Sequence, residues 1–141
     1  MKIVKISLVI FLCLALCSAA VSQKEDYQKK AEKFLADVLK GEIDKSYNEI
    51  LSKWIIEAKP QQVQMLKAQT KTAVNMYGNL LDYEFIKQQK YGDCIVRLVY
   101  VLKSERMPFT WEFYFYKAKE VSNWELVNIK FSDEYDLLAD K

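Results

Sequence analysis

The chain has 141 residues, of which 51% are hydrophobic, 28% charged and 13% aromatic, with a formal net charge of +2. This length and composition fit one folded domain with a proper core and exclude a disordered or low-complexity protein. With no His and only three Gly, the chain lacks Ser-His and Cys-His pairs, the commonest zinc ligand and a glycine-rich phosphate loop. We therefore predict no catalytic residue set, no metal and no cofactor.

The N-terminal segment has the pattern of a secretory signal peptide. Lys2 and Lys5 make the start of the chain positively charged. An apolar run then covers residues 6–16, and small residues follow it. The run is too short to span a bilayer comfortably. We predict cleavage after Ser22, with cleavage after Ala20 as the alternative, and hence an exported protein that is periplasmic or extracellular.

A bacterial lipoprotein is the other interpretation of this segment. Residues 14–17 resemble a lipobox in which Cys17 would be lipidated and retained. The position before such a cysteine normally holds a small residue, and Leu16 departs from that rule. A cleaved signal peptide therefore fits the residues better.

Cleavage would leave an electrically neutral domain. It removes two of the 21 basic residues and none of the 19 acidic residues, so the two charges balance. A neutral domain has no electrostatic reason to bind nucleic acid or an anionic membrane surface. Cys94 would be the last cysteine and could form no internal disulfide.

Three amphipathic helices are predicted first. Apolar residues recur every three or four positions over residues 26–40, which end at Gly41, and again over residues 43–55. Pro60 suits the first turn of a third helix, which runs through Tyr77.

From Leu81 the apolar period changes to two, which predicts four antiparallel strands over residues 81–90, 94–103, 109–117 and 124–131. The expected fold is α+β, with N-terminal helices packed on one face of a curved four-stranded sheet in a cystatin-like cone. The expected divisions are a signal peptide at 1–22, one domain at 23–131 and a polar tail at 132–141.

The strand pattern also assigns the two faces of this sheet. Residues opposite each other in an antiparallel meander point the same way, so one face collects the larger apolar set. That inner face, which should take the helices, is predicted to hold Leu81, Tyr83, Phe85, Cys94, Val96, Leu98, Tyr100, Leu102, Phe109, Trp111, Phe113, Phe115, Val127, Ile129 and Phe131.

The outer face mixes charged and apolar residues, which is typical of an interface. We expect a second copy of the chain to pair with it. Two alternatives are a sheet face that stays free and tolerates its aromatic residues, and a face covered by the C-terminal tail. The expected dimer-face residues are Arg97, Glu84, Glu112, Tyr114, Tyr116 and Trp124.

Arg97 is the most distinctive residue of the outer face. Its guanidinium could await a carboxylate or phosphate ligand. Pairing with Glu84 or Glu112 across the strands explains it more simply.

Aromatic residues between helices and sheet could line a pocket, because a curved sheet over helices frequently leaves a cavity. The candidate pocket residues are Tyr27, Tyr47, Trp54, Tyr77, Tyr83, Tyr100, Trp111 and Phe113. Plain core packing is the alternative.

The order of helices and strands, the aromatic strand at residues 111–116 and the closing strand from Trp124 to Ile129 resemble the superfamily of nuclear transport factor and ketosteroid isomerase. The nearest likeness is to small exported bacterial members without an assigned function. The resemblance implies a cone with a pocket and a dimer joined through the sheet. Isomerases of that superfamily use a carboxylate base with a Tyr and a protonated acid, but the predicted inner face carries no acid.

Three functions remain open from the sequence. The first is an exported non-catalytic module that binds a small apolar ligand or an envelope protein partner, as a homodimer. The second is an isomerase, cyclase or dehydratase with a carboxylate in the cone, which a one-residue slip of Glu84, Arg97 and Glu112 to the inside would allow. The third is a structural dimer with a filled core.

Overall fold

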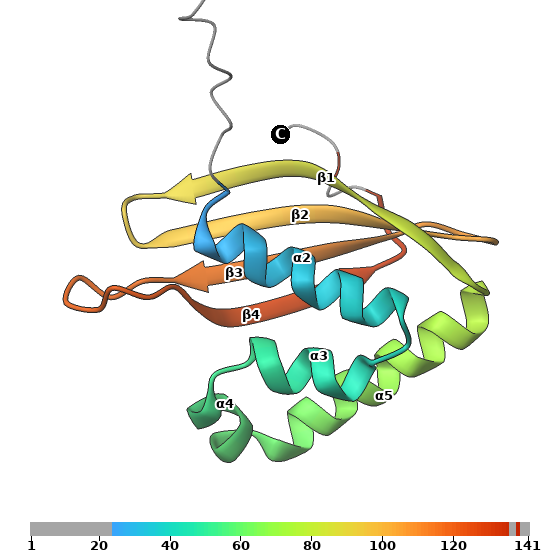
Figure 1. Ribbon diagram of the computed structural model, residues 1–141, viewed down its shortest axis with the longest axis horizontal. Coiled ribbons are helices and arrows are strands. Elements are labelled where there is room, and N and C mark those ends of the chain that lie inside the picture. The colour runs from blue at the N-terminus through green and yellow to red at the C-terminus, as the bar shows by residue number, and fades with distance from the viewer. Residues whose placement is uncertain (1–23, 136–137, 139–141) are drawn as a thin grey trace, which may run out of the picture.

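The computed structural model describes residues 24–135 and residue 138. The predicted signal peptide and Cys17 lie outside the described residues. Four helices are followed by four strands (Figure 1): α2 (Asp26–Leu39), α3 (Ile43–Ile50), α4 (Lys53–Ala58), α5 (Pro60–Tyr77), β1 (Leu80–Tyr91), β2 (Ile95–Ser104), β3 (Phe109–Tyr116) and β4 (Glu125–Ser132). The predicted α+β class is confirmed, with helices packed against a curved antiparallel sheet.

The predicted end of the second helix, at residue 55, is wrong. Instead of continuing to residue 55, α3 ends at Ile50, and Leu51 adopts an extended backbone with φ −78° and ψ 136°. Leu51 forms an isolated parallel bridge with Leu126 of β4. Leu51 still donates its amide hydrogen bond to the Tyr47 carbonyl at 3.1 Å, but its extended backbone ends the helix and carries the chain along β4, and α4 begins after Ser52.

The strands follow one another in the order β1-β2-β3-β4, each antiparallel to the next. The β2–β3 register is unbroken from Ile95 opposite Tyr116 to Leu102 opposite Phe109. The alternating apolar residues of these two strands, predicted to face inward, are all buried: Val96, Leu98, Tyr100, Leu102, Phe109, Trp111, Phe113 and Phe115.

Aromatic rings fill the space between α2 and the sheet. The Phe34 ring centroid lies 5.0 Å from that of Tyr47, 5.1 Å from that of Trp111 and 5.5 Å from that of Phe113, all edge to face. Such ring pairs add stability beyond the area they bury. α2 runs across the inner face of the sheet (Figure 1), and its buried side chains pack with those of the sheet in the hydrophobic core.

Irregularities in β1 and β4 overturn part of the predicted face assignment. The register shifts between Leu80 and Asp82, which leaves Leu81 61% exposed while Leu80 packs against the core. A second shift opposite Tyr114 and Phe115 buries Leu126 and leaves Val127 43% exposed. One extra residue in a strand reverses the alternation beyond it, so the strict period of two fails there.

Cys94 was also placed wrongly. It was expected to point into the core, but its side chain is exposed, because the residue belongs to the turn between β1 and β2.

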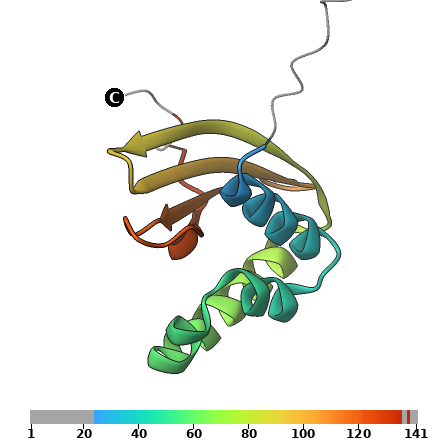
Figure 2. The ribbon, with the colours of Figure 1, turned by 60° about the vertical axis from the view of Figure 1, so that its left-hand side comes forward.

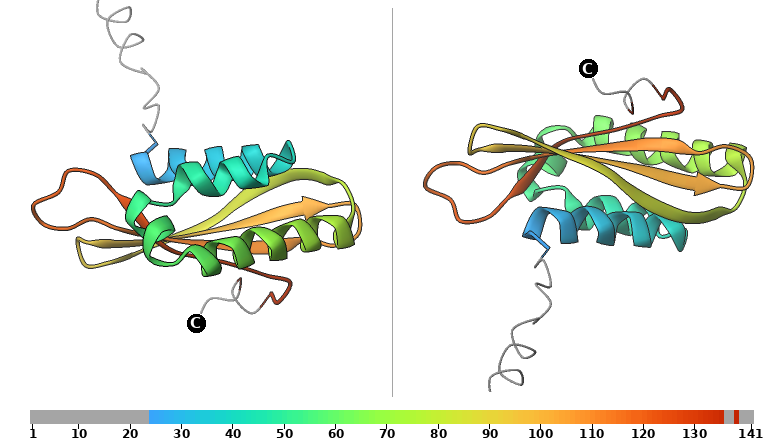
Figure 3. Two further views of the ribbon diagram at one scale, coloured as in Figure 1. Left: turned by 90° about the horizontal axis from the view of Figure 1, so that it is seen from below. Right: turned by 90° about the horizontal axis from the view of Figure 1, so that it is seen from above.

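The helices α3, α4 and α5 project away from the sheet beyond the edge formed by β4 (Figure 2). All four described helices lie on the same side as the inner face or beyond this edge, which leaves the outer face without a helical cover (Figure 3). Among residues 24–135, no helix is both long and apolar enough to cross a membrane.

Candidate functional site

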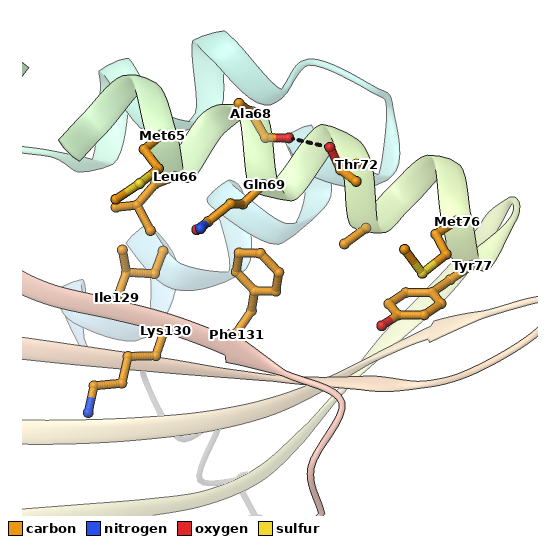
Figure 4. A pocket seen from close by; sticks show the side chains of 11 residues that line it. Met65, Leu66, Ala68, Gln69, Thr72, Met76, Tyr77, Ile129, Lys130 and Phe131 are labelled. Atoms are coloured by element: carbon orange, nitrogen blue, oxygen red, sulfur yellow. Dashed lines mark hydrogen bonds between the residues drawn. The ribbon is translucent and has the colours of Figure 1, made fainter. Parts of the chain in front are cut away.

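A groove of about 740 Å³ lies between α5 and β4. In Figure 4, α5 forms one wall and the free side of β4 forms the other, with Leu66 directed toward Ile129. We call it the α5–β4 groove; it is lined by Met65, Leu66, Ala68, Gln69, Thr72, Ala73, Met76, Tyr77, Ile129, Lys130 and Phe131.

The C-terminal end of α5, which includes the groove residue Tyr77, is fixed to the sheet. The carbonyl oxygen of Tyr77 accepts hydrogen bonds from Ser104 Oγ at 3.1 Å and from the Arg106 amide at 3.1 Å. The Tyr77 hydroxyl donates to Asp133 Oδ2 at 3.0 Å, and this bond raises the pKa of Tyr77. Hydrogen bonds therefore hold both the backbone carbonyl and the side-chain hydroxyl of Tyr77 at this end of the groove.

At its other end the groove continues into a second cavity near the α3–α4 connection. A smaller cavity of about 130 Å³ continues past Leu66 and Ile129 toward Trp54. It stops at the bridge between Leu51 and Leu126, already described for the break between α3 and α4. α5 is thus attached to the sheet at Tyr77 and to α3 through the hydrogen bond between Thr70 and Tyr47 at 2.8 Å.

The lining of the groove is apolar, with few polar groups. Met65 is 54% exposed and Met76 is 58% exposed, both on the groove wall of α5. Methionine side chains are flexible and polarisable, so they adapt to apolar ligands of varied shape. The charged residues lining the groove and the smaller cavity are Lys59 and Lys130, and neither lining contains an Asp or Glu.

Most of the predicted pocket residues form a packed core. Only Tyr77 lines the α5–β4 groove, and Trp54 lines the smaller cavity. Tyr83 is half-buried against Tyr100 with ring centroids 6.1 Å apart. The remaining five rings are fully buried: Tyr27, Tyr47, Tyr100, Trp111 and Phe113.

Buried polar atoms of these rings differ in their hydrogen bonding. The hydroxyls of Tyr47 and Thr70 are hydrogen-bonded at 2.8 Å, and burial raises the pKa of Tyr47 to about 12. Burial also raises the pKa of Tyr100. Within the described residues, the Tyr27 and Tyr100 hydroxyls and Trp111 Nε1 have no hydrogen-bond partner.

The outer face carries a network centred on Glu112. Arg97 Nε donates to Glu112 Oε2 at 2.6 Å, and the Tyr114 hydroxyl donates to the same oxygen at 2.9 Å. Arg97 also hydrogen-bonds Gln89, and its guanidinium lies 6.0 Å from the Tyr114 ring centroid. Burial opposes the charge of Arg97, but Glu112 outweighs it and the pKa of Arg97 is raised. The predicted pairing of Arg97 with Glu112 is therefore present.

Two other residues predicted for the outer face behave differently. Glu84 pairs with Lys103 at 2.8 Å and not with Arg97, because Glu84 lies opposite Val101, four residues along β2 from Arg97, whereas Arg97 lies opposite Gln89. Trp124 packs edge to face on Tyr27 of α2 at 5.2 Å, so it lies on the helical side.

The groove was missed because its signal is split between distant segments. Met65, Ala68, Thr72 and Met76 lie three or four residues apart on α5 and form a second stripe beside the buried one, at a spacing that places them on one helix face. Their partner Phe131 is more than 50 positions away on β4.

No family model matches the chain, and no curated protein has a matching sequence. What the fold and site of the described residues define is an α+β structure with an open apolar groove between its last helix and its edge strand.

Proposed function

We propose that the protein is an exported, non-catalytic binding module that takes an apolar ligand, or an apolar segment of an envelope protein partner, into the α5–β4 groove. The observation that carries the proposal is the groove itself. It offers about 740 Å³ of apolar space in a domain whose core is otherwise filled by rings. Ligand sites commonly occupy a few hundred to about 1,000 Å³ and are mainly apolar.

The exposure of the two methionines supports this role. An apolar side chain left in water costs free energy that a bound apolar surface recovers, at about 25 cal/mol per Å². Met65 and Met76 stand on the same wall, and Phe131 faces them from β4 (Figure 4). Three adaptable or aromatic side chains thus converge on one space.

The carboxylates near the sheet support binding over catalysis. Glu84 and Glu112 lie on the outer face and are each paired with a cation, and no carboxylate lines the groove within the described residues. The one-residue slip that would bring Glu84, Arg97 and Glu112 inside is wrong, because Val96 and Phe113 occupy the inner face.

We further propose that the outer face joins two copies of the chain. Tyr91 and Tyr116 are half-exposed and lie on either side of Ile95 in the register, beside the Arg97–Glu112 pair. This cluster combines exposed aromatic side chains with an ion pair that is already desolvated, as interface centres often do. The resemblance to sheet-joined dimers of the nuclear transport factor superfamily also supports it.

Groove binding is tested with the mature chain, residues 23–141, and the fluorescent probe anilinonaphthalene sulfonate. We expect saturable binding that falls about tenfold or more in the double variant M65Q/M76Q, because two apolar contacts become polar. The matched control is Val121→Gln in the β3–β4 loop, which replaces an exposed apolar side chain outside the groove. Equal affinity in all three proteins would reject the groove as the site.

Dimer formation is tested by sedimentation equilibrium of the same protein. Tyr116→Glu should shift the population to monomer, whereas Val127→Glu, on an exposed residue of β4, should not. A wild-type protein that stays monomeric at about 100 μM would reject the dimer without affecting the groove proposal.

A further inference from the structure

The free side of β4 presents backbone hydrogen-bonding groups to the α5–β4 groove. The Lys117 amide donates to the Cys94 carbonyl at 2.9 Å, which fixes the phase of the β2–β3 ladder. In that phase Phe113 bonds to β2, and its neighbours in β3 bond to β4. The pairs of β3 with Lys130 and Asn128 are therefore the hydrogen-bonded ones.

It follows that the N–H and C=O groups of Ile129 and Phe131 point away from β3. α5 lies beyond this edge of the sheet (Figures 1 and 4), so these groups point toward the groove. Within the described residues no hydrogen bond to them is formed. An unpaired row of this kind is a template for another strand.

The chain already uses this edge once. Leu126 has the same outward phase, and it pairs in parallel with the extended residue Leu51. The pairing ends there because α4 begins at Lys53. The edge beyond Leu126 is thus a continuation of a strand-pairing surface that accepts an extended segment.

The opposite edge of the sheet differs in its side chains. Asp82, Glu84, Lys87 and Lys90 are spread along β1. Charged residues on an edge strand discourage pairing with another chain. β4 carries its outward backbone beside apolar groove walls instead.

We propose that the groove binds a short extended peptide segment, which adds to β4 as a fifth strand and places alternate apolar side chains between α5 and the sheet. This inference rests on the proposed function and names the class of ligand. Strand addition draws affinity from backbone pairing and specificity from side-chain pockets.

The dimensions and charge of the groove define the segment. The wall from Met65 to Met76 spans about 16 Å at the helical rise, which matches about five residues of a strand. The Lys130 ammonium lies 5.6 Å from the Tyr114 ring on the outer face, so Lys59 is the charged residue of the two linings that remains for the segment, and it favours an acidic residue at the flank nearest to it.

The test uses a capped heptapeptide of sequence ETVTVTE and the same peptide with N-methyl groups on alternate amides facing β4. N-methylation removes donors and keeps the apolar side chains. The protein variants are Phe131→Pro and Phe131→Ala. Both variants lose the aromatic ring, and only the proline variant also loses the outward N–H. Edge strands tolerate proline, so we expect both variants to fold.

We expect the peptide to bind by fluorescence anisotropy, to displace anilinonaphthalene sulfonate and to shift the amide resonances of residues 129 and 131. F131P should bind about tenfold more weakly than F131A, the loss expected for one or two backbone hydrogen bonds. The N-methylated peptide should be weaker by a similar factor.

Three results would overturn the inference. Equal binding of both peptides would mean apolar docking without strand addition. A protein that binds the dye and not the peptide would keep the proposed function and limit the groove to small molecules. Concentration-dependent self-association abolished by F131P would make a second copy of this chain the occupant. Absence of dye binding, by contrast, would reject the proposed function itself.

Discussion

Replacing Glu112 by Ala should destabilise the domain strongly, although the residue lies on a face that no described helix covers. Its carboxylate accepts hydrogen bonds from Arg97 at 2.6 Å and Tyr114 at 2.9 Å, and the two side chains of the ion pair are only 11% and 5% exposed. Leaving one partner of a buried pair uncompensated costs about 3–5 kcal/mol. Because Arg97 keeps its bond to Gln89 and some contact with water, we expect about 3 kcal/mol, measured by urea unfolding at pH 7.

The double variant R97M/E112L separates the ion pair from packing. It removes both charges and keeps apolar volume, so we expect it to recover most of the stability lost in E112A. The single change Glu112→Gln, which keeps an acceptor oxygen, should lie between the two. A cost below 1 kcal/mol for E112A, or a double variant as unstable as the single one, would refute a desolvated pair on this face.

Three smaller predictions concern other contacts. Tyr47→Phe should lower the free energy of unfolding by about 1 kcal/mol, because the buried hydrogen bond between the Tyr47 and Thr70 hydroxyls is lost while Thr70 keeps its bond to the Leu66 carbonyl; an unchanged urea midpoint would contradict this. The hydrogen bond from Lys33 holds the pKa of Asp37 below its usual 3.8, so this carboxylate stabilises the fold above about pH 4 and loses that effect as the pH falls through its folded pKa. The acid unfolding curve of D37N should accordingly be flatter below pH 4 than that of the wild type, and parallel curves would argue against the ion pair. Cys94 should react with a thiol reagent at the rate of an unfolded control without loss of structure, whereas a rate that follows unfolding would show that it is buried.

The interior of the sheet was predictable because β2 and β3 pair without interruption. Their alternation assigns Val96 and Phe113 to the core. Once the length of the turn between β2 and β3 is placed correctly, the register assigns every other residue of the two strands to a face. β1 and β4 contain shifts whose positions depend on the partner strand, and nothing local in the sequence marks them. Leu51 left its helix for the same reason, since its backbone partner Leu126 is 75 positions away.

The groove was harder to predict than the core. Apolar periodicity identifies the side of a helix that is buried most deeply, and on α5 that side includes Val63, Thr70 and Ala73. Met65 and Met76 lie on a neighbouring side, and their importance depends on the distance between α5 and β4. That distance is set by the attachments of α5 to the sheet at Tyr77 and to α3 at Thr70, which are tertiary contacts.

These two attachments have a consequence for how fast and how tightly a ligand is captured. Because α5 is held to the sheet at Tyr77 and to α3 at Thr70, we expect the groove to keep its width when a ligand binds. The groove walls then lose little conformational entropy when a ligand binds, because folding of the domain has already ordered them. Encounter should proceed in a single kinetic phase, limited by diffusion and orientation and without a slow opening step.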